Sequence, residues 1–195
     1  MRTIHQTIMS DELIVNKSKF IGYCLVGKSR DDFIDAIRFI SKNMVSANHV
    51  AFAYRLITKQ GVDGYFNDAG EPSGTAGKPL LNILEKQSIV NSGLAVVRFY
   101  GGINLGTGGL ARAYTRSGMA ALNMAKVTDF IHYFEYKLSI RYNMLDKITN
   151  EISKNQGSIL KKTFNEDITI IIRVTEEVFL NILKLFPTIH TERLN

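Results

Sequence analysis

The chain has 195 residues, 45% of them hydrophobic and 22% charged, so it can bury a core and lies between one domain and two in size. It lacks the roughly 18 uninterrupted apolar residues of a membrane span and the start of a signal peptide, and its single cysteine excludes an internal disulfide, so we expect a cytoplasmic protein. Lys and Arg exceed Asp and Glu by 24 to 18, a modest excess that attracts phosphates or acidic partners.

Up to residue 67, the hydrophobic pattern predicts one helix, with one strand before it and two strands after it in the sequence. Residues 20–26 and 49–58 read as strands, and residues 64–67 as a shorter one. A helix is predicted over residues 29–44, with Ser29 as its N-cap and acidic residues in its first turn. One apolar stripe runs along this helix, formed by Phe33, Ile37, Ile40 and Met44.

The middle of the chain is rich in glycine, because twelve of the fifteen glycines lie between Gly61 and Gly118. A helix is predicted over residues 79–88, and the apolar run at residues 93–100 predicts a buried strand. A longer helix follows from about residue 108 to residue 125. The distribution of glycine indicates that the specialised surface lies in this part of the chain.

The end of the chain predicts a separate βαββα order and a final strand. The expected boundary lies near Val127 and divides the chain into residues 1–127 and 128–195. This order is typical of a ferredoxin-like α/β sandwich, so the fold class expected for the chain is α+β. The predicted segments are a strand within 129–142, a helix within 143–156, strands at 158–164 and 167–174, a helix at 175–186 and a last strand within 188–194.

Two glycine-rich loops each precede a predicted helix: DAGEPSGTAGKP, from Asp68 to Pro79, and YGGINLGTGGLARAY, from Tyr100 to Tyr114. A helix start exposes unpaired N–H groups and the positive end of the helix dipole, so such loops form anion cradles for phosphate. Neither loop is a Walker A motif, because Pro79 stands where Ser or Thr would bind magnesium, and neither has the GxGxxG spacing. The alternative is that the glycines only allow positive φ or close backbone packing.

Charged and aromatic side chains extend this candidate surface. Arg112 and Arg116 share a helix face, and Arg98 and Tyr100 share a strand face. The alternatives are solvated arginines and buried tyrosines. The candidate binding residues are Glu71, Pro72, Ser73, Gly74, Thr75, Gly77, Lys78, Arg98, Tyr100, Gly101, Gly102, Gly106, Gly108, Gly109, Arg112, Tyr114 and Arg116.

Asp68 and Glu71 are the acids of the first loop and the candidates for catalysis, as a base or as magnesium ligands. An acid just before a helix is more often a cap. His49 has no second histidine at ligand spacing, and Cys24 lacks the local signature of a nucleophile. We therefore expect no metal site and no cofactor, and the sequence favours a non-enzymatic protein.

The segments NDAGEPSGTAGKPLLNIL and VVRFYGGINLGTGGLARAYTRSGMAAL resemble the signature of the IMPACT family in its bacterial, YigZ-like form. Upstream, SKFIGY and NHVAFAYRL fit the family's pattern, although Asn48 stands where a threonine is expected before His49. The likeness covers about Lys17 to Val127, and the tail resembles the family's smaller C-terminal domain. It implies an N-terminal α/β domain of the fold shared by a ribosomal protein domain, elongation factor G and the GHMP kinases, followed by a ferredoxin-like domain.

Three functions follow from the loops and this resemblance. The first is a non-enzymatic regulator of translation or of the stress response, which binds RNA or a ribosome-associated protein through the glycine loops. The second is a phosphate-handling enzyme, a phosphotransferase or hydrolase, that uses Asp68 or Glu71. The third is a pure protein-binding scaffold. No membrane partner is expected in any of them.

Overall fold

The computed structural model describes residues 1–194 and divides into two compact units, Met1–Phe130 and Ile131–Asn195. Each unit has its own hydrophobic core. The boundary lies slightly beyond the predicted one at Val127, because β7 (Val127–Asp129) pairs antiparallel with β1 (Arg2–Ile4) of the first unit. The last residues before the boundary therefore belong to the first unit.

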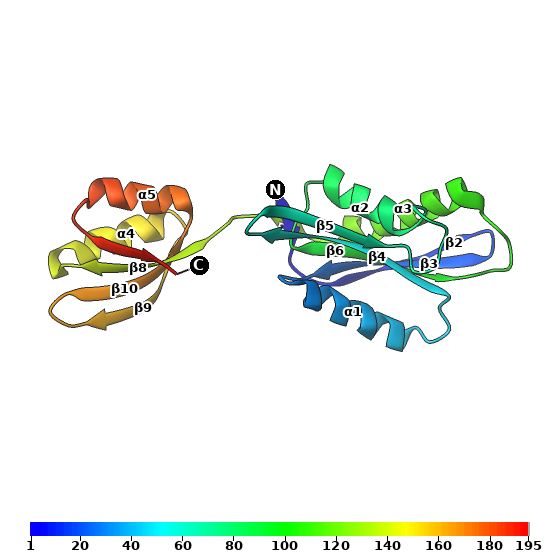
Figure 1. The fold of residues 1–195 in the computed structure, drawn as a ribbon, viewed down its shortest axis with the longest axis horizontal. Helices are drawn as coiled ribbons and strands as arrows, with labels where there is room; N and C mark the ends of the chain where they lie inside the picture. The colour runs from blue at the N-terminus through cyan, green and yellow to red at the C-terminus, as the bar shows by residue number, and fades with distance from the viewer. Residues whose placement is uncertain (195) are drawn as a thin grey trace. The chain divides into compact units, whose positions relative to one another are not determined.

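The first unit contains a five-stranded antiparallel sheet, in which β6 is the central strand (Figure 1). Its strand order is β2-β3-β6-β4-β5, which places the strand that comes last in sequence in the middle of the sheet. The strands are β2 (Ile8–Val15), β3 (Ser18–Val26), β4 (His49–Thr58), β5 (Gly61–Asn67) and β6 (Ser92–Phe99).

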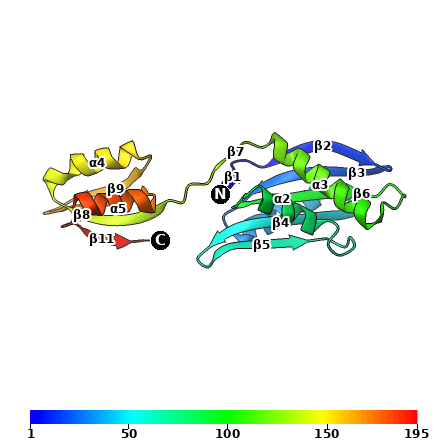
Figure 2. The same cartoon turned by 90° about the horizontal axis from the view of Figure 1, so that it is seen from above.

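Helices cover both faces of this sheet. The helix α1 (Arg30–Asn43) lies on one face, while α2 (Gly77–Lys86) and α3 (Gly106–Met124) lie together on the other (Figures 1 and 2). Alternate residues of β6 therefore enter two cores: Leu94 and Val96 pack on the α2 and α3 side, Ala95 and Val97 on the α1 side. Burial on both faces explains the continuous apolar run of β6 and confirms the predicted buried strand.

The helix predicted over residues 29–44 is confirmed as α1, with Ser29 as its N-cap. The Asp32 N–H donates to Ser29 Oγ at 3.2 Å, and the Ser29 N–H donates to the Asp32 carboxylate at 2.9 Å. This reciprocal capping box satisfies two amides at the helix start. Phe33 and Ile40 of the predicted stripe are buried against the sheet.

Three strands of the first unit escape sequence prediction. The strands β1 and β7 have three residues each and are too short to display a period. The register of β2 against β3 shifts between Met9 and Glu12, so its side chains do not alternate cleanly between the two faces.

The second unit is a four-stranded antiparallel sheet with the order β11-β8-β10-β9. The chain order βαββαβ with this strand order is that of a ferredoxin-like fold, which confirms the prediction, including the final strand. Its core is mostly isoleucine and leucine from the sheet and from α4 and α5. The elements are β8 (Phe134–Ile140), a 3-10 turn η1 (Tyr142–Met144), α4 (Leu145–Lys154), β9 (Ser158–Phe164), β10 (Ile168–Val174), α5 (Glu176–Leu185) and β11 (His190–Arg193).

Because each unit has its own core, chymotrypsin should separate them by cutting after Phe130 or Tyr133, between β7 and β8. Limited digestion followed by mass spectrometry should give two stable fragments, each retaining the circular dichroism of a folded domain. A single resistant product spanning residues 120–140 would contradict independent folding of the units.

Candidate functional site

Both glycine loops leave the same end of the five-stranded sheet. The strand β5 ends at Asn67, and β6 ends at Phe99. Their common neighbour β4 begins there at His49, which pairs with Arg98, and β3 begins there at Ser18. Each loop leads into a helix, as predicted. We call this region the glycine-loop end; it comprises residues 68–76, residues 100–105 and the turn at residues 16–17.

A buried cluster of three side chains, the Glu71 cluster, joins the two loops. Arg98 Nη1 at the end of β6 donates to Glu71 Oε1 at 2.7 Å and to Oε2 at 2.9 Å, and Tyr114 Oη of α3 donates to Oε1 at 2.7 Å. The side chains of Arg98 and Glu71 are 6% and 3% exposed. Burial, together with the Glu71 carboxylate, raises the pKa of Tyr114, so its hydroxyl remains a donor.

The Arg98 guanidinium is enclosed on its other sides as well. It lies 5.5 Å from the ring centroid of Phe20 and 5.2 Å from that of Tyr100, within the range of a cation–π contact. Its Nη2 donates to Ser18 Oγ at 3.4 Å, and the same hydroxyl accepts the Gly101 N–H at 3.1 Å. A side chain on Gly101 would collide with the backbone at Lys17 and Ser18, so this position requires glycine.

The first loop folds around the Asp68 carboxylate. Its Oδ2 accepts the Gly74 N–H at 2.8 Å, and its Oδ1 accepts the N–H groups of Ala76 and Gly77 at 3.0 and 2.8 Å. The amides of Ala76 and Gly77 belong to the start of α2, which therefore holds a carboxylate of its own chain at the position expected for an anion cradle. Asp68 has the geometry of a cap, which is the alternative to a catalytic role for this acid.

The second loop leaves the start of α3 without a comparable group. The N-cap residue Leu105 has no side-chain acceptor, and the first turn of α3 contains no acid. Arg112 Nη1 lies 3.5 Å from the position that a Cβ on Gly108 would occupy, so its guanidinium lies close to this turn. A cation beside the positive end of a helix dipole is unfavourable unless an anion is added.

Two arginines of the first unit are unpaired. Arg112 and Arg116 are exposed and have no hydrogen-bond or ion-pair partner among residues 1–194. The other five arginines of Met1–Phe130 are engaged: Arg2 with Gln87, Arg30 with the Tyr65 ring, Arg38 with Asp35, Arg55 with the carbonyls of Leu84 and Ile89, and Arg98 with Glu71.

The helices on the two faces of the sheet differ in their balance of charge. Together α2 and α3 contain four basic side chains and a single acid, Glu85, whereas the three basic residues of α1 are matched by three aspartates. Because α2 and α3 cover the same face of the sheet, that face is the basic one (Figure 2).

The remaining predicted residues divide into exposed and structural ones. Tyr100 is 44% exposed, and its hydroxyl donates to Asn104 Oδ1 at 3.0 Å. Gly74 has a φ of +75° and open space around a Cβ, so backbone conformation alone requires glycine there. A Cβ at position 77 would lie 2.6 Å from the Asn67 backbone, so this position has no room for a side chain. Pro72, Ser73, Lys78, Gly102, Gly106 and Gly108 are exposed, Gly109 is half-buried, and Thr75 is buried.

Sequence reasoning missed Ser18 and Asn48, which support the second loop. Asn48 Oδ1 accepts the Tyr100 N–H at 2.7 Å, as Ser18 Oγ accepts that of Gly101. Their partners lie more than fifty positions away, and nothing in the local pattern identifies them. His49 Nδ1 donates to the Ala69 carbonyl at 2.9 Å, so this side chain ties the start of β4 to the first loop.

Among residues 1–194, no group of three or more His, Cys, Asp or Glu side chains is arranged to hold a metal ion. No helix in the same range is long and apolar enough to cross a membrane.

Comparison with known proteins identifies relatives of the chain. Residues 16–122 match the Impact N-terminal domain. The chain is 33% identical over 157 residues to the IMPACT family member YvyE of Bacillus subtilis, covering 80% of this chain and 72% of that protein. It is 32% identical over 166 residues to an IMPACT family member of Haemophilus influenzae, covering 84% and 80%. A solved structure of a hypothetical protein shares the fold, with a TM-score of 0.69 at 23% identity over 100% of this chain and 97% of that one.

Replacing Glu71 should strongly destabilise the first unit. Glu71→Ala leaves the Arg98 charge buried without a counter-charge, and we expect a loss of about 3–5 kcal/mol in the free energy of unfolding, measured by urea denaturation. The double variant Glu71→Ala/Arg98→Met should lose less than Glu71→Ala alone. Glu12→Ala, which breaks an exposed pair with Lys19, is the control and should cost less than about 1 kcal/mol. Equal losses for Glu71→Ala and Glu12→Ala would contradict this account.

Asp68→Ala should free one amide of the first loop and two at the start of α2, at a cost of about 1–3 kcal/mol of stability. Since the vacated helix start can accept an external anion, added sulfate should raise the melting temperature of this variant more than that of the parent. Asp63→Ala, at an exposed position of β5, is the control and should melt as the parent does. An unchanged melting temperature for Asp68→Ala would show that the loop does not depend on this carboxylate.

Proposed function

Because the chain belongs to the IMPACT family, we propose that it is a non-enzymatic cytoplasmic regulator of translation, which binds RNA through the second glycine loop and the exposed side of α3. A solved structure of the two-domain translational regulator Yih1 is similar over 61% of this chain and 47% of that one, at 20% identity and a TM-score of 0.42. The observation that carries the RNA-binding proposal is that Arg112, whose guanidinium lies beside an uncapped helix start, and Arg116, one turn further along α3, are both unpaired among residues 1–194.

Electrostatics supports an anionic partner on α3. Arg112 and Arg116 are four residues apart on one helix, so they repel each other by a few tenths of a kcal/mol. The positive end of the α3 dipole also disfavours the Arg112 guanidinium, which lies beside the first turn. A phosphate backbone lying along the helix would reverse both effects, and RNA supplies phosphates at regular spacing. The exposed ring of Tyr100 in the adjoining loop offers a surface on which a base can stack.

The state of the two acids supports a non-enzymatic role. A phosphotransferase or hydrolase would use Asp68 or Glu71 as a base or magnesium ligand. The Asp68 carboxylate accepts three backbone amides, and Glu71 is paired with Arg98 and Tyr114 inside the protein. Both carboxylates therefore serve the fold of the first loop.

A ribosome-associated protein is the second candidate partner. Ile103, in the second loop, is 42% exposed and lies close in sequence to the exposed Tyr100. An apolar and an aromatic side chain in one exposed loop are typical of protein-binding surfaces. This partner would make binding far less sensitive to salt than RNA does.

Removing the unpaired arginines should weaken RNA binding in steps. Each arginine–phosphate interaction that is removed lowers the slope of log affinity against log salt by about one, so Arg112→Ala and Arg116→Ala should each flatten the slope and the double variant should flatten it further. Fluorescence anisotropy with a single-stranded RNA over a salt series measures this slope. Arg141→Ala is the matched control, because Arg141 is also exposed and unpaired among residues 1–194 but belongs to the second unit.

The proposal fails if the parent protein binds RNA with no salt dependence. It also fails if the double variant binds as tightly as the parent. If Arg141→Ala lowers the slope as much as Arg112→Ala, the surface on α3 is not the RNA-binding one.

A further inference from the structure

A groove runs between α2 and α3 on the basic face of the first unit. Its floor is apolar and includes Ile83 and Met119, and its polar side chains include Asn82, Lys86, Gln87 and Thr115. Its volume is about 330 Å³, at the lower end of small-molecule sites. A groove of this size suits a single planar ring system better than an extended ligand.

The polar groups of the groove have unused hydrogen-bonding capacity. Thr115 Oγ1 donates to the Ala111 carbonyl at 2.8 Å, which leaves its lone pairs free to accept. Gln87 Oε1 accepts from Arg2, so the amide NH₂ of Gln87 remains a donor. The Asn82 amide has no partner within residues 1–194. Donors and an acceptor thus surround an apolar floor, as the edge and the faces of a nucleobase require.

The charge around the groove is entirely positive. Lys86 lines it, and Arg112 and Arg116 lie on α3, which forms one of its walls. No acidic side chain lines the groove, and the single acid of the two helices, Glu85, is not among the lining residues. This complementarity favours a ligand whose ring is flanked by phosphates.

We propose that this groove takes one unstacked base of a single-stranded RNA, with the neighbouring phosphates held by Lys86 and the arginines of α3. The inference rests on the proposed function and specifies it: the partner is single-stranded, and it is recognised through a base as well as through its backbone. A duplex keeps its bases stacked and paired, so it presents none to this groove.

The test compares a single-stranded RNA oligonucleotide with an abasic oligonucleotide of the same length and backbone. The parent protein should bind the abasic strand several-fold more weakly at equal salt, because no base fills the groove. Asn82→Ala should lower affinity for the normal strand by about three- to ten-fold and leave affinity for the abasic strand unchanged. Asn123→Ala, an exposed asparagine near the end of α3 and outside the groove, is the matched control and should change neither affinity.

A cross-linking arm locates the base directly. An oligonucleotide with one photoreactive uridine should cross-link to peptides covering residues 79–87 or 111–119. Cross-links confined to other segments, or a parent protein that binds normal and abasic strands equally, would overturn the base groove. In that case RNA binding still stands if the arginine variants flatten the salt slope. If no strand binds at all, the groove and the proposed function fall together.

Discussion

The buried pair between Arg98 and Glu71 is the constraint on which the glycine-loop end depends. Removing two charges from water is costly, and hydrogen bonds offset part of this cost: Glu71 Oε1 accepts from Arg98 and Tyr114, Oε2 accepts from Arg98, and Arg98 Nη2 donates to Ser18. Arg98 Nε is buried and has no partner among the described residues. Glu71 comes from the first loop, Arg98 from the central strand and Tyr114 from α3, so the three elements must be assembled together. The second loop is then held by Ser18 against the same guanidinium, which is why Gly101 has no room for a side chain.

This arrangement makes two loops of similar composition physically different. At the start of α2, the Asp68 carboxylate accepts the amides of Ala76 and Gly77 and lies at the positive end of the helix dipole, and it also accepts the Gly74 amide of the loop. The start of α3 has no such group, and Arg112 adds a positive charge beside it. The first loop is therefore a structural element of the sheet end, and the uncompensated charge is concentrated at the second. A bound anion would give the start of α3 the negative charge that Asp68 gives to the start of α2.

The sequence predicts helices and strands well where the hydrophobic periodicity is strong. It predicts the candidate functional site only in outline. The capped helix α1, the apolar strand β6 and the whole second unit follow from hydrophobic pattern, whereas the three-residue strands β1 and β7 carry too little pattern to be found. The glycine content of the sequence identifies the two loops. It does not show that Arg98 is buried while Arg112 and Arg116 are exposed. Arg98 lies on a strand buried on both faces, where alternation carries no information about exposure. Its partner Glu71 is 27 positions away, so only the fold brings the two together.

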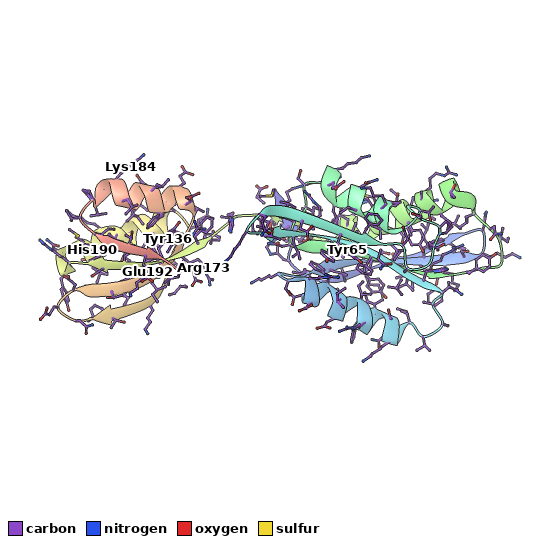
Figure 3. All side chains as sticks on the ribbon, in the orientation of Figure 1. Tyr65, Tyr136, Arg173, Lys184, His190 and Glu192 are labelled. Carbon is purple, nitrogen blue, oxygen red and sulfur yellow. The ribbon has the colours of Figure 1, made fainter. Side chains whose placement is uncertain are left out.

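The open face of the sheet in the second unit differs from the exposed side of α3 in how its charges are paired. Its sheet has one face away from α4 and α5, and the central strands present Glu135, Lys137, Ile171 and Arg173 on it. Arg173 pairs with Glu135 at 2.7 Å and Lys137 with Glu192 at 3.4 Å, and Figure 3 shows Arg173 and Glu192 on this sheet. RNA-binding sheets of this fold stack bases on aromatic side chains of the central strands, and none is present at these positions. Two basic side chains of this face are therefore already paired with acids, and its central strands offer no aromatic ring to a base. On α3, by contrast, Arg112 and Arg116 have no acidic partner among residues 1–194, so a phosphate would gain more there than at Arg173 or Lys137, whose charges are already paired.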